Sequence, residues 1–220
     1  MSFILHPSSF IPPEAALRPL VKRLGLVDYA KAFRAMREFT ANRQSDTPDE
    51  IWLLEHFPVY TMGLNGKSEH FPENGTRIPM IATDRGGQIT YHGPGQLVVY
   101  LLLDLKRKKL GARGLVRMME RLVIELLLDH EVIGHTLAGM PGVYVDGAKI
   151  AAVGLRITRG CSYHGLALNV DMDLTPFLHI NPCGYPHLRV TQTKDLKIRS
   201  GIDDLAGELS EKVIAVLERS

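Results

Sequence analysis

The sequence predicts one α+β domain in which mixed, mostly antiparallel β-sheets are flanked by helices. Strand-like and helix-like segments follow one another without the regular strand–helix–strand alternation of a doubly wound parallel sheet. Two long strand-like runs also flank Arg159-Gly160, which is the pattern of an antiparallel hairpin. The 220 residues, 45% of them hydrophobic, suffice for one large core. We expect residues 1–24 to be a mobile extension and residues 25–220 to form a single domain.

Three amphipathic helices are expected. The first follows Asp28 as N-cap, has apolar side chains at helical spacing from Tyr29 onward, and ends in the polar stretch 42–50. In the second, apolar side chains recur every three or four positions between residues 115 and 127. Ser200 and Asp203 have the spacing of a capping box and begin the third.

The strands are predicted from short runs of β-branched and aliphatic residues between Gly, Pro and Asn turns. These runs are residues 51–55, 59–62, 80–83 and 96–103. The hairpin adds residues 148–158 and 161–171.

Charge and composition exclude several classes of function. Twenty-six basic and 24 acidic residues give a net charge of +2, which is too small to indicate a nucleic-acid binder. Two cysteines, Cys161 and Cys183, are too few for a disulfide framework and indicate a reducing compartment. No apolar run approaches the ~18 residues of a membrane span, and the proline-broken start lacks a secretory signal. We expect a cytoplasmic protein with no nucleic-acid or membrane partner.

Three segments resemble known binding motifs, but the spacing of their residues does not fit those motifs. His130 and His135 resemble a zinc-binding pair but are five positions apart, whereas a helix needs four. Residues 63–68 imitate a phosphate-binding loop with too few residues between the glycines, and residues 93–95 lack the third glycine of a dinucleotide fingerprint. We therefore expect no metal and no nucleotide cofactor.

One dense basic run, residues 106–109, is reinforced by Arg113, Arg117 and Arg121. Such runs are most often solvated surface. The alternative interpretation is a docking site for an acidic partner.

The hairpin places small residues opposite one another. With Arg159-Gly160 as a two-residue turn, opposed residues have numbers that sum to 319, so Gly154 faces Gly165 and Ala152 faces Ala167. Glycine and alanine at these positions have too little side chain to pack against the residue on the facing strand. Either a slender acyl chain or a closely packed helix is expected to fill the space.

The other face of the same hairpin has the pattern of an ordinary core. Alternation places Val153, Leu155 and Ile157 there, against Leu166, Leu168 and His164 of the second strand.

Cys183 is the candidate nucleophile. It lies between Pro182 and Gly184, where a turn can present a side chain to a cavity. An ordinary thiol is only about 3% thiolate at pH 7, and a nearby ammonium can raise that fraction to about 75%. Lys149, at the hairpin end, is the candidate neighbour. Strict alternation points Lys149 to the core face, so the pairing requires a β-bulge there.

The glycine-rich loop 84–96 is the candidate ligand loop. Thr90 and His92 share one side of an extended chain and can face one pocket. The backbone amides of Gly86 and Gly87 are candidates to bind a carbonyl or carboxylate oxygen. His92 is either a general base or a hydrogen-bonded structural histidine.

Six segments, taken in order, closely resemble the lipoyl(octanoyl) transferase family. They are residues 85–96 (RGGQITYHGPGQ), 141–145 (PGVYV), Lys149, 154–157 (GLRI), 160–170 (GCSYHGLALNV) and 181–185 (NPCGY). The resemblance implies the catalytic domain that biotin protein ligases and lipoate ligases share. It also implies that Cys183 forms a thioester and that Lys149 lowers the pKa of this cysteine.

The same resemblance implies which residues line the substrate pocket. They are Arg85, Gly86, Gly87, Gln88, Ile89, Thr90, Tyr91, His92, Ala152, Val153, Gly154, Gly165, Leu166 and Ala167.

The implied reaction transfers an octanoyl group from acyl carrier protein to a lysine of a lipoyl domain. The implied acceptors are 2-oxoacid dehydrogenase subunits and the glycine cleavage H protein, and the implied state is a monomer without a cofactor. Two half-reactions at Cys183 suffice, with Lys149 as base towards the incoming amine.

Three alternatives remain at this stage. An ATP-dependent lipoate or octanoate ligase would require ATP and Mg²⁺, a non-catalytic binding module would form no covalent adduct, and a thioesterase would release free octanoate. Cys161 is the competing nucleophile, but it lies beside the hairpin turn, ~20 Å along the strand from Ala167.

Overall fold

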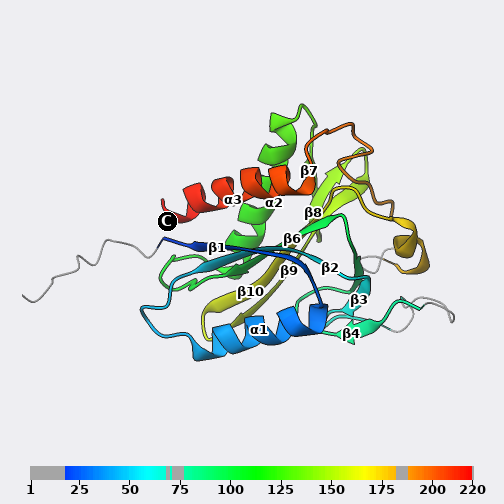
Figure 1. Ribbon diagram of the computed structural model, residues 1–220. Helices are drawn as coiled ribbons and strands as arrows, with labels where there is room; N and C mark the ends of the chain where they lie inside the picture. Colours follow the sequence, from blue (N-terminus) through cyan, green and yellow to red (C-terminus); the bar gives the residue numbers. More distant parts are fainter. Residues whose placement is uncertain (1–17, 68–69, 71–76, 182–187, 220) are drawn as a thin grey trace, which may run out of the picture.

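The computed structural model describes residues 18–67, 70, 77–181 and 188–219. A large sheet separates helix α1 on one face from helices α2 and α3 on the other (Figure 1). The helices are α1 Tyr29–Asn42, α2 Ala112–Asp129, α3 Ile202–Leu217 and a short 3₁₀ helix, Thr175–His179. The strands are β1 Leu20–Val27, β2 Glu50–His56, β3 Val59–Met62, β4 Met80–Ala82, β5 Ile89–His92, β6 Gln96–Leu102, β7 His135–Leu137, β8 Met140–Val145, β9 Ala148–Thr158 and β10 Cys161–Asn169.

The described strands form two sheets that are mostly antiparallel. The large sheet has the order β1-β2-β6-β10-β9-β8-β7, and only its β1–β2 pair is parallel. The small sheet has the order β4-β3-β5, with β3 and β4 parallel. The predicted α+β class is confirmed. No helix in the described part of the chain is long and apolar enough to cross a membrane.

The helices begin and end close to where the sequence predicts. Asp28 caps α1 by accepting a hydrogen bond from the Lys31 amide at 2.9 Å. Helix α3 begins one residue later than expected: Gly201 is the N-cap, and the Asp204 carboxylate accepts from its amide at 3.1 Å. Apolar stripes on α2 and α3 bury one face of the sheet, because their side chains recur at helical spacing.

Strand β1 is the longest of the strands that the sequence did not predict, which also include β5 and β7. Its residues 20–24 lie in the segment expected to be an extension, yet they pair in parallel with β2. As an edge strand it is exposed at nearly every position, and the register shifts between Arg23 and Gly25. An exposed edge lacks the hydrophobic alternation that predicts a half-buried strand.

The hairpin has the predicted register. Gly154 pairs with Gly165 and Ala152 with Ala167. Arg159 and Gly160 both have positive φ, 51° and 85°, as a two-residue turn of the primed type requires.

The basic run 106–109 lies beside this turn, at the opposite end of the hairpin from Lys149. Thr158 lies nine positions after Lys149 on β9, which corresponds to ~30 Å of strand. Arg107 forms an ion pair with the buried Asp49 carboxylate at 2.8 Å, and the buried Lys108 donates to the Leu217 carbonyl at 2.5 Å. Two members of the run therefore stabilise the fold rather than face solvent.

Candidate active site

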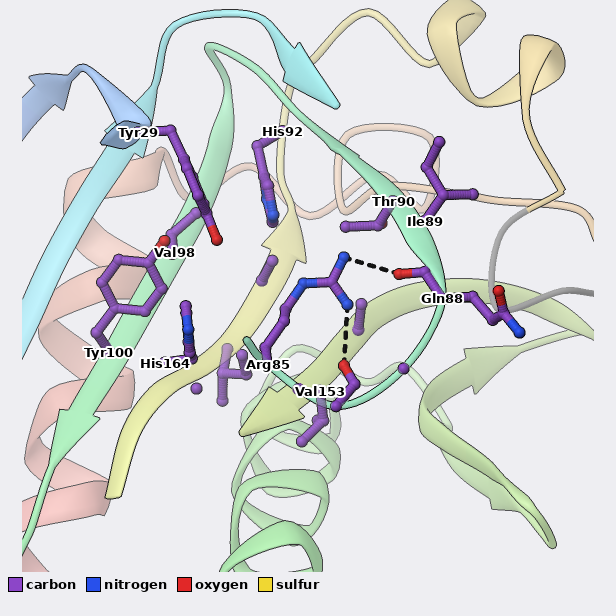
Figure 2. Close-up of a pocket in the computed structure, with 17 residues that line it drawn as sticks. Tyr29, Arg85, Gln88, Ile89, Thr90, His92, Val98, Tyr100, Val153 and His164 are labelled. Atoms are coloured by element: carbon purple, nitrogen blue, oxygen red, sulfur yellow. Dashed lines mark hydrogen bonds between the residues drawn. The ribbon is translucent and has the colours of Figure 1, made fainter. Parts of the chain in front are cut away.

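One cavity brings together the predicted pocket residues of the glycine-rich loop and the hairpin (Figure 2). The space that it encloses, including the open mouth, is about 540 Å³. Of the predicted pocket residues, only Tyr91 is not among those that line this cavity. Tyr91 instead packs against Tyr60 and Phe177 beneath the small sheet.

The two facing glycines are required for different reasons. A Cβ at Gly165 would lie 2.0 Å from the Val99 carbonyl oxygen of the neighbouring strand, so the β6 backbone itself excludes a side chain. A Cβ at Gly154 would lie 3.2 Å from Arg85 Cδ. Ala152 and Ala167, the next opposed pair, line the open cavity. The small-residue pattern thus reflects close packing at Gly165 and space for a ligand at the alanines.

Arg85 fixes the conformation of the ligand loop. Its buried guanidinium donates to the Thr61 carbonyl at 2.7 Å, to Thr61 Oγ1 at 2.9 Å, to the Gln88 carbonyl at 2.9 Å and to the Gly86 carbonyl at 3.0 Å. Figure 2 shows the guanidinium at the centre of the loop it ties together. Such bonds to a charged group are stronger than neutral ones, so they hold the loop in shape.

The sequence predicts that the amides of Gly86 and Gly87 are both available to a ligand, but only one of them is. The Gly86 amide donates to the Leu155 carbonyl at 2.9 Å and fastens the loop to β9. The prediction that the Gly86 amide is free to bind a carbonyl or carboxylate oxygen is therefore wrong, and of the two candidate amides only that of Gly87 remains.

Aromatic and imidazole rings line one end of the cavity. Tyr29, Tyr100, His92 and His164 surround it there (Figure 2). Sequence reasoning missed Tyr29, Val98, Tyr100 and His164. Two of them could have been found from the alternation of side chains along a strand. Val98 and Tyr100 lie on the same side of β6, and their partners on β10 are Ala167 and Gly165.

His164 is on the opposite face from the one predicted. Its φ of 62° breaks the alternation of β10, so its ring turns away from the α2 side. It stacks on Phe33 of α1 with ring centroids 5.4 Å apart, and its Nε2 lies 3.0 Å from Asp84 Oδ1. The other Asp84 oxygen accepts from the Tyr163 hydroxyl at 2.5 Å. Asp84 thereby fastens the start of the ligand loop to β10.

Burial keeps the histidines of this region neutral. It lowers the pKa of His56 to about 4, and it also lowers the pKa of His92 and of His164. His92 Nδ1 lies 2.7 Å from Gln96 Oε1, and His56 Nε2 lies 2.7 Å from the Tyr100 hydroxyl. These contacts favour the structural interpretation of His92 over a general base.

Lys149 occupies the irregular position that its proposed role requires. Val143 pairs with Ala151 but Tyr144 pairs with Lys149, so the β8–β9 register slips by one residue. Ile150 and Ala151 consecutively enter the core beneath α2, which shows that alternation lapses here. Lys149 is 4% exposed.

The Lys149 ammonium is held by β8. Its Nζ donates to the Pro141 carbonyl at 3.0 Å and lies 5.2 Å from the centre of the Tyr144 ring.

The chain that follows Cys183 returns to Lys149. The Lys149 amide donates to the Arg189 carbonyl at 2.8 Å, and the Thr191 amide donates to the Lys149 carbonyl at 2.9 Å. Val190 thus forms a parallel bridge with Lys149. Cys183 itself lies outside the described residues, so its pairing with Lys149 stays a prediction.

Cys161 has the environment of a poor nucleophile. It is half-buried beside the hairpin turn and bridges to Asp104. Burial, with the Asp104 carboxylate, raises the pKa of its thiol.

Glu120 of α2 stabilises the segment that holds Lys149. It is 8% exposed, and its Oε1 accepts from the Gly142 amide at 2.9 Å, next to the Pro141 carbonyl that binds Lys149. We expect Glu120→Ala to lower kcat about tenfold while leaving the KM for the acyl donor within about twofold. Glu120→Gln keeps an acceptor and should restore most of the kcat. Equal losses in both variants would contradict a positioning role.

The family model described as the lipoyl protein ligase A/B catalytic domain matches residues 28–214. The chain therefore belongs to this family. Curated relatives named octanoyltransferase include that of Nitrosomonas eutropha, 58% identical over 90% of this chain and 87% of the relative. Another, from Nitrosospira multiformis, is 56% identical over 96% of each chain.

Solved structures agree on the fold. Lipoate-protein ligase A bound with ATP superposes with a TM-score of 0.73 at 17% identity, over 91% of this chain and 85% of that one. Biotin protein ligase from Aquifex aeolicus superposes with a TM-score of 0.54 at 12% identity, over 92% of this chain and 70% of that one.

Proposed function

We propose that this protein is an octanoyltransferase of protein lipoylation and that it works through a thioester on Cys183. The observation that carries the mechanism is the buried Lys149 ammonium. It lies three residues before the cavity-lining Ala152 on the same strand, and it is bridged to the chain that follows Cys183. The high identity to octanoyltransferases supports the acyl group.

The first half-reaction forms the octanoyl-enzyme. The Cys183 thiolate attacks the carbonyl carbon of the donor thioester, a new C–S bond forms, and the donor C–S bond breaks. The leaving thiolate takes up a proton. The cavity beside β9 and β10 takes the acyl chain, because Ala152, Ala167 and Gly154 leave room for it.

The second half-reaction forms an amide. The acceptor lysine amine attacks the Cys183 thioester, the C–N bond forms, and the Cys183 thiolate leaves. After acylation, the buried Lys149 ammonium no longer has the thiolate charge beside it, so it gives its proton to the leaving thiolate of the donor and becomes a neutral amine. Lys149 therefore accepts the proton that the amine loses. A thioester is converted into an amide, which is downhill without ATP.

The donor in this proposal is octanoyl-acyl carrier protein. The acceptors are lipoyl domains of 2-oxoacid dehydrogenase subunits and the glycine cleavage H protein. The octanoyl chain and its carbonyl group bind to the loop and hairpin residues of the cavity, which include Arg85, Gly87, Gln88 and Thr90.

Intact-protein mass spectrometry after mixing with octanoyl-acyl carrier protein tests this function. We expect a gain of one octanoyl group without ATP or Mg²⁺, absent in Cys183→Ala and kept in Cys161→Ala. An adduct that persists in Cys183→Ala would reject the nucleophile. A strict requirement for ATP and Mg²⁺ would instead indicate a ligase, and release of free octanoate in the presence of acceptor would indicate a thioesterase.

A further inference from the structure

A second hollow adjoins the acyl cavity on the α2 side of β9. The first half of α2, the β7–β8 hairpin and the outer edge of β9 form this groove. Gly86, Gly87 and Gly154 line both the groove and the acyl cavity, so the two spaces adjoin at these glycines. A ligand in the groove therefore lies beside the acyl cavity.

The groove exists because β8 covers only part of β9. Their pairing ends at Gly142 and Ala152, and beyond it the Gly86 amide bonds to the Leu155 carbonyl. Val153, Leu155 and Ile157 are left only partly buried along this stretch and form the apolar floor of the groove.

Three arginines rim this floor. Arg113 and Arg117 come from α2 and Arg156 from β9. Within the described part of the chain, none of the three forms an ion pair, whereas Arg121, one turn further along α2, lies 3.4 Å from Glu125. Glu120 is the acidic residue of the groove lining, and it is buried and bound to the Gly142 amide. The accessible charge of the groove is therefore positive.

One of these arginines also lies where a helix disfavours it. Helix α2 begins at Ala112, so Arg113 falls in its first turn, which has no acidic residue. A cation near a helix N-terminus opposes the macrodipole at a cost of about 0.3–1 kcal/mol. A negatively charged partner on this surface would offset that cost.

The basic run 106–109 is a weaker candidate for the same partner. Arg107 and Lys108 are engaged with Asp49 and the Leu217 carbonyl, and the run lies at the turn end of the hairpin. Arg113, Arg117 and Arg156 instead line the groove that adjoins the acyl cavity.

We propose that this groove is the docking surface for the acidic face of the acyl donor protein, a claim that rests on the proposed function. Arg113, Arg117 and Arg156 contact carboxylates of the donor. The arm that bears the thioester passes along the β9 edge, past Gly154, into the acyl cavity. The donor is favoured over the acceptor because the groove adjoins the cavity that receives the acyl chain. An acceptor needs only to reach the thioester carbonyl.

The test compares a protein donor with a small one. Arg113→Glu/Arg117→Glu should raise the KM for octanoyl-acyl carrier protein about tenfold or more, with kcat nearly unchanged. Acylation of Cys183 by octanoyl-pantetheine, which has no protein surface and no net charge, should stay within about twofold. Arg121→Glu is the matched control on the same helix and should behave like the unaltered protein with both donors.

Direct binding separates docking from chemistry. Calorimetric titration with unacylated acyl carrier protein should show binding that weakens with salt and is lost in the double variant. An unchanged KM, equal losses with both donors, or a rise only in the KM for the lipoyl domain would overturn the proposal. Salt-dependent binding without any acylation of Cys183 would support the docking surface and reject the proposed function.

Discussion

Lys149→Met is expected to slow octanoyl transfer about 10³-fold or more. The side chain is similar in length and apolar, so it fits the buried position beside the Tyr144 ring, but it removes the ammonium. At pH 7 the thiolate fraction of Cys183 should fall from about 75% to about 3%. Loss of the base in the second half-reaction adds a factor of about 10²–10⁴ to that step.

The pH dependence of iodoacetamide alkylation at Cys183 separates the two roles of Lys149. In the unaltered protein, the alkylation rate should reach about three quarters of its maximum by pH 7, and in Lys149→Met its rise should move to more alkaline pH. Cys161→Ala removes the other thiol from the measurement. Identical alkylation profiles in the two proteins would show that Lys149 does not ionise Cys183.

Acid is expected to destabilise the fold well above the pH at which carboxylates titrate. Burial lowers the pKa of His56 to about 4 and also lowers the pKa of His92 and His164. Below pH 6.5 the unfolded chain binds protons at these three positions while the folded chain does not, so stability is present above pH 6.5 and is lost as the pH falls. His56, with its pKa of about 4 in the folded chain, contributes about 1.4 kcal/mol between pH 7.5 and 5.5, and His92 and His164 add to the loss in the same direction.

Urea unfolding at pH 7.5 and 5.5 measures this loss. His56→Gln should reduce it by about 1.4 kcal/mol, because one buried imidazole is removed. His135→Gln, at an exposed position, is the matched control and should leave the loss unchanged. A free energy of unfolding that is equal at the two pH values would contradict neutral burial of the cluster.

The fold class and most elements follow from local patterns. Helical spacing predicts α1 and α2, and the turn at Arg159-Gly160 fixes the register of β9 and β10 because the length of a hairpin turn decides which residues pair. Strand β1 was missed since its exposed edge position leaves no alternation to detect. Its pairing with β2 depends on contacts between distant segments, which no local pattern reveals.

The site was predictable where alternation holds and not where the backbone departs from it. The facing pairs at Gly154 and Ala152 follow from the hairpin, whereas His164 was assigned to the wrong face because its positive φ rotates the side chain. The proposed pairing of Lys149 with Cys183 required an irregularity in β9 at Lys149, and the structure has a register shift there. Tyr29 could not be placed at the cavity, because only packing of α1 on the sheet brings it there.

The basic run 106–109 shows that a cluster of charged residues in a sequence need not be an accessible charged surface in the fold. Residues 106–109 are the most conspicuous cluster, yet a buried carboxylate and a helix carbonyl engage two of them. Arg113 and Arg156 are far apart in the sequence and come together only when α2 packs beside β9.

A single-turnover chase tests the central claim most directly. The octanoyl-enzyme is separated from its donor and mixed with a lipoyl domain, and the masses of both proteins are followed with time. We predict that the octanoyl group leaves Cys183 and appears on the acceptor lysine at a rate no slower than kcat. An isolated acyl-enzyme that keeps its octanoyl group, or loses it only to water while the acceptor stays unmodified, would contradict transfer through Cys183.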